Sequence, residues 1–289
     1  MEPDTTVIPK LSVYHSTISC LILSLIYVGS LYVWRSEHNR DHPSTVKKRF
    51  FSVSIVMLIS PVFIYIFLIA NKSTNISIWE IMGFRTKGAL AAATIPLLLT
   101  ATLFLGPISA IISNGAAKQY IESAYWLESF QNILWLRNHI VAPLSEEFTF
   151  RACMMPLLLQ SYQPTTAVLL TPLFFGVAHL HHIIERIRSG MDWKTTFIVS
   201  TFQFLYTGIF GIYSSYLFAK TGHFIAPFVA HAFCNHMGFP DVQEALTQSN
   251  KKKFLIIACY IIGLVSWIYL LTIVTQPNWY FNELYWKHV

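Results

Sequence analysis

The stretch FLIIACYIIGLVSWIYLLTIVT, residues 254–275, decides the class of this protein. A helix needs about 20 consecutive apolar residues to cross a bilayer, and this stretch carries no charged residue. Other apolar blocks are expected to form spans at residues 11–34, 50–71, 89–113, 141–161, 165–183, 195–219 and 222–238. We therefore expect an all-α, polytopic integral membrane protein of about eight transmembrane helices.

The composition points to the same class. Hydrophobic residues make up 54% of the 289 residues and charged residues only 12%, which is about half the charge of a soluble domain. The mean hydropathy of +0.49 excludes a disordered chain, a collagen-like fibre and a small disulfide scaffold. The cysteines lack C-x-x-C spacing, so we expect small buried side chains and no disulfide framework or zinc ribbon at Cys20, Cys153, Cys234 and Cys259.

The net charge of +6 would suggest a nucleic-acid partner for a soluble protein. In a membrane protein, excess lysine and arginine usually occupies the cytoplasmic loops and sets the orientation. Eight spans with the N-terminus in the lumen place 13 of the 20 lysines and arginines in cytosolic segments. We therefore expect the lipid bilayer as a partner, no nucleic acid, and this orientation. The oligomeric state has no signature in the sequence.

The first chemically distinctive segment is APLSEEFTFR, residues 142–151. Pro143 suits the first turn of a helix, so we expect a helix to begin there. Glu147 and Arg151 are four residues apart on one helical face and can pair, either to support a site or as a purely structural pair. Glu146 is rotated by about 100° from Glu147 and need not share that partner. Such a carboxylate can serve as general base to a water molecule.

Two later segments add histidines and an amide. His179 lies in FFGVAHLHH, and His231 lies four residues before Asn235 in HAFCN. The purely structural alternatives are a packing role for His179 and interhelical hydrogen bonds for His231 and Asn235. The expected topology brings Glu146, His179 and His231 to one depth, near the cytosolic face. His231 and Asn235 can both donate hydrogen bonds to an oxyanion.

These side chains suit water-mediated hydrolysis of an acyl bond. Neither a G-x-S-x-G elbow nor an H-E-x-x-H motif occurs, so neither a serine hydrolase nor an ordinary zinc protease is indicated. A zinc site of Glu146, His179 and His231 is an alternative, because it would have three ligands and an open water position. No two of the three have the spacing of four residues that zinc-binding helices favour. We therefore favour chemistry without a metal or any other cofactor.

The three motifs together resemble the type II CAAX prenyl endopeptidases of the ABI membrane family. That family's pattern is E-E-x-x-x-R, F-x-x-x-H and H-x-x-x-N. It stands here, in order and without departure, as Glu146-Glu147-x-x-x-Arg151, Phe175-x-x-x-His179 and His231-x-x-x-Asn235. The resemblance is strong over residues 130–240 and vague in the first 120 residues.

The resemblance implies a protease of the endoplasmic reticulum membrane whose active site faces the cytosol. Its substrates would be farnesylated or geranylgeranylated CAAX proteins, such as Ras-type small GTPases, from which it removes the last three residues. Glu146 would activate the water with help from His179, and His231 and Asn235 would stabilise the oxyanion. Glu147 and Arg151 would support the geometry of the site.

The resemblance also implies an organisation of the chain. Residues 1–120 would form N-terminal helices around a catalytic core at residues 121–240, followed by a last helix and tail at residues 241–289. Two rival functions are an intramembrane peptidase for unprenylated substrates and a non-catalytic scaffold or transporter. A transporter usually shows inverted repeats, and the sequence has none.

Overall fold

The computed structural model describes residues 11–35, 37–69, 76–178 and 181–286, and every regular element in these ranges is helical. The expectation of an all-α membrane protein is thereby confirmed. The α-helices are α1 Val13–Ser30, α2 Pro43–Ile64, α3 Ile78–Ile81, α4 Ala89–Leu103, α5 Leu105–Ser113, α6 Ser123–Gln131, α7 Ile133–Leu136, α8 Ala142–Glu147, α9 Met155–Leu159, α10 Pro164–Ala178, α11 His181–Arg188, α12 Trp193–Thr221, α13 Ile225–Met237, α14 Val242–Thr247 and α15 Asn250–Val274.

Shorter helical segments of other kinds lie between them. Three are π-helical turns, at Tyr65–Ile69, Arg137–Val141 and Phe148–Met154, and two are 3₁₀ turns, at Ala116–Ile121 and Pro277–Tyr280. The last two π turns lie on either side of α8, so the chain stays helical from Ile133 to Leu159 but its α-helical winding is interrupted twice. Single π turns inside helices are frequent at functional sites.

Not all of the eight expected spans are long enough to cross a membrane. By length and composition, the described residues contain four such helices: α1, α2 with its π-helical continuation, α12 and α15. The pair α4 and α5 adds a fifth if it counts as one span, although the pair is bent by 71° at the break between the two helices. The count of eight is therefore not confirmed.

The expected spans that are too short to cross a membrane are the helices that carry the polar motifs. Helices α10 and α13 have 15 and 13 residues. At 1.5 Å per residue they reach about 20 Å, whereas the hydrocarbon core is about 30 Å thick. The run from Ile133 to Leu159 is divided into short pieces and contains Glu146, Glu147 and Arg151. These helices are packed among longer ones, which is where charged side chains in a membrane are tolerated.

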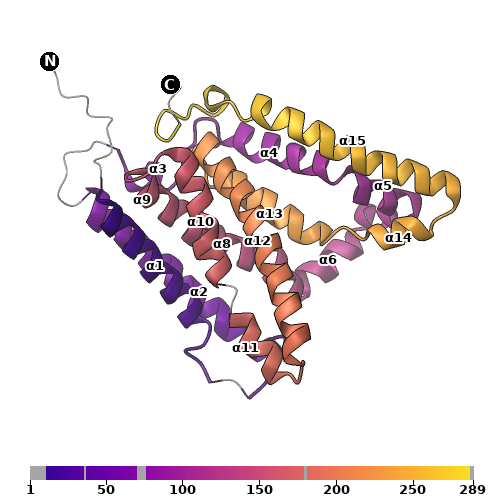
Figure 1. Ribbon diagram of the computed structural model, residues 1–289, viewed down its shortest axis with the longest axis horizontal. Helices are drawn as coiled ribbons and strands as arrows, with labels where there is room; N and C mark the ends of the chain where they lie inside the picture. Colours follow the sequence, from indigo (N-terminus) through magenta and orange to yellow (C-terminus); the bar gives the residue numbers. More distant parts are fainter. Residues whose placement is uncertain (1–10, 36, 70–75, 179–180, 287–289) are drawn as a thin grey trace.

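The arrangement places these short helices in the middle of the molecule. Figure 1 shows α1 and α2 along one side, α15 with α4 and α5 along another, and α10, α12 and α13 between them. The largest buried core joins α1 and α2 to the run from Ile133 to Leu159 and to α10 and α12. Among its fully or almost fully buried side chains are Leu23, Val56, Phe150, Phe175 and Phe218.

The packing of α15 against α4 and α5 depends on a close approach at Gly263. A Cβ atom there would lie 2.6 Å from the backbone oxygen of Thr102 and 3.1 Å from Cβ of Leu105. Gly208 in α12 is a matched control, because a Cβ atom there would meet nothing within 4 Å.

We predict that Gly263→Ala lowers the stability of the detergent-solubilised protein by about 1–3 kcal/mol, the usual cost of overpacking. Gly208→Ala should be neutral or stabilising by up to about 1 kcal/mol, because alanine is the better helix former. Thermal unfolding of the two variants beside the wild type is the measurement. A Gly263→Ala protein as stable as Gly208→Ala would contradict the close approach.

Candidate functional site

The helix that carries the acidic motif begins earlier than the sequence suggested. It was expected to start near Pro143, but it starts at Ile133, where the Asn132 side chain accepts hydrogen bonds from the backbone N–H groups of Leu134 and Trp135. Proline inside a helix lacks its own N–H and clashes with the carbonyl four residues before it. The π turn Arg137–Val141 ends two residues before Pro143 and contains His139, four residues before the proline, so the wider winding there accommodates Pro143.

Glu147 is the best-connected side chain of the site. Arg151 Nη1 donates to Glu147 Oε1 over 3.1 Å, so the expected pair of the two residues is present. Ser214 Oγ donates to the other oxygen, Oε2, over 2.6 Å, and His231 Nδ1 lies 2.6 Å from Oε1. Glu147, Arg151 and Ser214 have no exposed surface. One carboxylate therefore joins the acidic helical run to α12 and α13.

Arg151 has further contacts that fix its position. Its Nη2 donates to the backbone oxygen of Gly211 in α12 over 3.3 Å, and its guanidinium lies 4.7 Å from the ring centre of Phe175 in α10. A cation over an aromatic face is stabilised by the quadrupole of the ring. Phe175 belongs to the second sequence motif, so two of the motifs meet at Arg151.

His231 connects the buried cluster to Glu146. A carboxylate bound by arginine accepts hydrogen bonds only, so Nδ1 of His231 must carry the hydrogen that faces Glu147. The opposite ring nitrogen, Nε2, then points to the Glu146 side and lies 3.8 Å from Glu146 Oε2. That distance is too long for a direct hydrogen bond and is one at which a bridging water should be considered. The Phe210 ring covers the imidazole, with the ring centres 4.6 Å apart.

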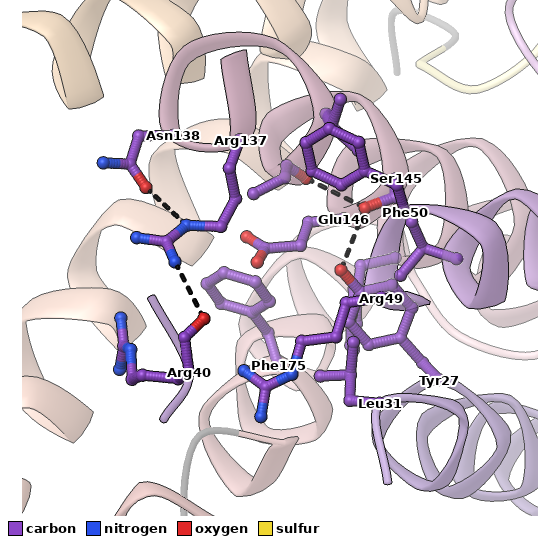
Figure 2. Close-up of a pocket in the computed structure, with 14 residues that line it drawn as sticks. Tyr27, Leu31, Arg40, Arg49, Phe50, Arg137, Asn138, Ser145, Glu146 and Phe175 are labelled. Carbon is purple, nitrogen blue, oxygen red and sulfur yellow. Dashed lines mark hydrogen bonds between the residues drawn. The ribbon is translucent and has the colours of Figure 1, made fainter. Parts of the chain in front are cut away.

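Glu146 differs from Glu147 in that it faces a pocket. The pocket has a volume of about 170 Å³, and Figure 2 shows the carboxylate of Glu146 among the labelled side chains that line it. The walls include four aromatic rings and three arginines, contributed by Tyr27, Phe50, Phe150, Phe175, Arg40, Arg49 and Arg137. The two adjacent glutamates are thus separated as expected, one in the buried cluster and one at the pocket.

Asn235 lies one helical turn beyond His231 but does not line the pocket. Its Nδ2 donates to the backbone oxygen of Asn138 over 2.8 Å, and Asn138 is itself a lining residue. Asn235 is exposed, whereas His231 is buried. The structure therefore brings Glu146, Glu147, Arg151 and His231 together and connects Asn235 only to the edge of the pocket.

His179 lies outside the described residues. The zinc alternative of Glu146, His179 and His231 therefore remains a hypothesis. Among the side chains that the structure does describe, no group of three or more histidines, cysteines, aspartates and glutamates is arranged to hold a metal ion.

Some residues of the site were missed from the sequence. Ser214 binds Glu147, and the Tyr27 hydroxyl lies 3.0 Å from Ser145 Oγ at the pocket wall. A signal for Ser214 exists, because serines in long apolar helices tend to hydrogen-bond to polar side chains of neighbouring helices. The position of Tyr27 at the pocket could not be predicted from the sequence, because a tyrosine in the first apolar block is usually an ordinary buried aromatic residue.

Comparison with known proteins places the chain in one family. The family model "Type II CAAX prenyl endopeptidase Rce1-like" matches residues 128–237, the part that contains the described site. Proteins named CAAX prenyl protease 2 match nearly the whole chain. The human protein is 42% identical over 94% of this chain and 84% of its own length. The rat protein is 38% identical over 94% of this chain and 83% of its own length.

A more distant relative has the same name and also matches most of the chain. CAAX prenyl protease 2 of Arabidopsis thaliana is 34% identical over 91% of this chain and 90% of its own length. No solved structure matches the chain.

The buried pair gives a prediction about stability. We expect Arg151→Met to lower the free energy of unfolding by about 3–5 kcal/mol, because it removes the guanidinium that pairs with the buried Glu147 carboxylate. The matched control is Asp41→Asn, which breaks an ion pair with Arg137 in which the Asp41 side chain is 53% exposed. Exposed pairs contribute about 1 kcal/mol or less. Equal losses in denaturant unfolding of the two variants would contradict the central position of the Glu147–Arg151 pair.

Proposed function

This chain belongs to the family of type II CAAX prenyl endopeptidases, which are intramembrane proteases, and on that premise we propose what it cleaves and how. The substrates are proteins that end in Cys-aliphatic-aliphatic-X and carry a farnesyl or geranylgeranyl group on the cysteine. The enzyme hydrolyses the peptide bond after that cysteine. The products are a prenylcysteine with a free carboxylate and a tripeptide.

The observation that carries the proposed mechanism is the position of Glu146, which faces the pocket. Its Oε2 lies 3.8 Å from Nε2 of His231, and the other ring nitrogen of His231 is hydrogen-bonded to Glu147. In this mechanism a water between the two groups loses a proton to Glu146 while its oxygen bonds to the scissile carbonyl carbon. Glu146 then passes the proton to the leaving nitrogen as the carbon–nitrogen bond breaks. The reaction as proposed needs no metal or other cofactor.

His231 and Asn235 stabilise the oxyanion in this proposal. Because Nδ1 of His231 faces a carboxylate, Nε2 can donate only when the ring is an imidazolium. With that charge, the two glutamates, Arg151 and His231 together are electrically neutral, which favours such a cluster in a buried setting. Asn235 has a second N–H beyond the one that Asn138 accepts. His179 assists Glu146, as the family pattern implies.

The pocket suits the aliphatic part of the substrate. Tyr27, Phe50, Phe150 and Phe175 supply apolar walls beside the Glu146 carboxylate. A prenyl chain partitions into a bilayer at about 0.8 kcal/mol per buried CH₂, so the lipid delivers the peptide along the membrane. The enzyme works on substrates that are already anchored at its own depth.

We further propose that the enzyme resides in the endoplasmic reticulum membrane with the pocket open to the cytosol. Arg40 and Arg49 line the pocket and also a larger groove of about 820 Å³. The groove is lined in addition by Arg35, Arg186 and Arg188. Clustering of arginine on one side of a membrane protein favours the cytosolic side. The arginines at the pocket and the groove support the proposal that the pocket opens to the cytosol.

The proposed function is tested with a farnesylated CAAX peptide and purified protein, wild type and Glu146→Gln, with and without a zinc chelator. We expect mass spectrometry to show loss of the three C-terminal residues with the wild type, unaffected by chelator. Glu146→Gln should be inactive, because an amide cannot accept the proton of water. Glu128→Gln is the matched control, since Glu128 is an exposed glutamate of α6 outside the pocket lining, and it should keep full activity.

Cleavage by Glu146→Gln would remove Glu146 as the base. Sensitivity to the chelator would replace the proposed mechanism with the zinc alternative. Absence of cleavage by folded wild-type protein would contradict the proposed function.

A further inference from the structure

Three arginines share the pocket with Glu146. Figure 2 shows the side chains of Arg40, Arg49 and Arg137 around the Glu146 carboxylate and the Phe175 ring. The side chains of Arg49 and Arg137 are only 19% and 18% exposed, and that of Arg40 is 49% exposed. The ion pairs of these three arginines are with Asp41 and Glu185, whereas Glu146 faces His231. Their role is therefore separate from the proposed activation of water.

The three arginines are held in one network by two carboxylates. Arg137 Nη1 donates to Asp41 Oδ1 over 2.7 Å, and Arg49 Nη2 donates to Glu185 Oε1 over 2.9 Å. Arg40 lies between these two pairs, 3.5 Å from Asp41 Oδ1 and 3.7 Å from Glu185 Oε2. Three guanidinium groups thus face two carboxylates. Within this set of five side chains, one positive charge is left over at the edge of the pocket.

Arg40 is the arginine with the weakest contacts of its own. Its two ion pairs are longer than hydrogen bonds, whereas Arg49 and Arg137 each have a short, charge-assisted one. It also lies where the pocket meets the larger groove, since it lines both. A guanidinium with free N–H groups and an unbalanced charge matches one kind of ligand particularly well, a carboxylate monoanion.

We propose that Arg40, supported by Arg49 and Arg137, binds the C-terminal carboxylate of the substrate. This inference rests on the proposed function, in which bond cleavage three residues from the chain end requires the enzyme to recognise that end. Three extended residues span at most about 10 Å, so a group that binds the carboxylate must lie near the same pocket as Glu146. The tripeptide product carries this carboxylate away, and Asp41 and Glu185 hold the arginines in place for the next substrate.

The test compares two farnesylated CAAX peptides that differ only at the C-terminus, one a free acid and one a carboxamide. Wild-type protein should cleave the acid with a kcat/KM about 10- to 100-fold higher, the range expected for a hydrogen bond to a charged group. Arg40→Ala should lower kcat/KM for the acid much more than for the amide, so that the preference for the acid is lost. Arg40→Lys should restore part of the preference.

Cleavage of the amide serves as an internal check that the variant is folded. The matched control is Arg188→Ala, because Arg188 lines the groove but not the pocket, and the preference for the acid should remain. Three results would overturn this inference and leave the proposed function standing. The first is equal cleavage of both peptides by the wild type, and the second is an equal loss of kcat/KM on both peptides in Arg40→Ala. The third is loss of the preference for the acid in Arg188→Ala. Absence of cleavage of either peptide by the wild type would overturn the proposed function and this inference with it.

Discussion

The geometry of the site depends on one buried carboxylate. Glu147 receives Arg151 from its own helical run, Ser214 from α12 and His231 from α13, and it has no exposed surface. An ionised carboxylate at such depth is tolerated only when countercharges and hydrogen-bond donors satisfy it. Each of its partners is therefore fixed in place, and the face of His231 that remains is turned to Glu146. The adjacent glutamate is left free to act at the pocket, so two neighbouring residues of one helix have different tasks.

Much of this arrangement follows from the sequence. Apolar blocks predicted the helical membrane fold, because only long runs without charge can cross a bilayer. The spacing of four residues between Glu147 and Arg151 predicted their contact, and the offset of Glu146 from Glu147 predicted that the two acids face different surroundings. The resemblance to the endopeptidase family rested on motif residues alone, and the similarity of nearly the whole chain to proteins named CAAX prenyl protease 2 agrees with it.

Other features depend on packing that a linear pattern does not contain. Hydropathy cannot distinguish a long span from a shorter apolar helix packed among others, so α10 and α13 were counted with the full-length spans. The π turns on either side of α8 could not be foreseen, because Pro143 alone is compatible with a helix start and with a widened turn. The bond between Glu147 and His231 joins residues 84 positions apart. His231 was expected to pair functionally with Asn235, its neighbour on the helix, and its strongest contact lies on another helix instead.

The central claim is that Glu147 positions His231 for catalysis, and the most direct test is the steady-state kinetics of Glu147→Gln beside Ser214→Ala. Both variants remove a hydrogen-bond partner or charge from the same cluster, but only the first changes the group that faces His231 Nδ1. The account predicts that Glu147→Gln lowers kcat by on the order of 10²–10⁴, as for other carboxylates that orient a catalytic histidine, with KM nearly unchanged. Ser214→Ala should keep most of its kcat. A Glu147→Gln enzyme with kcat close to that of the wild type, or equal losses in both variants, would contradict the claim.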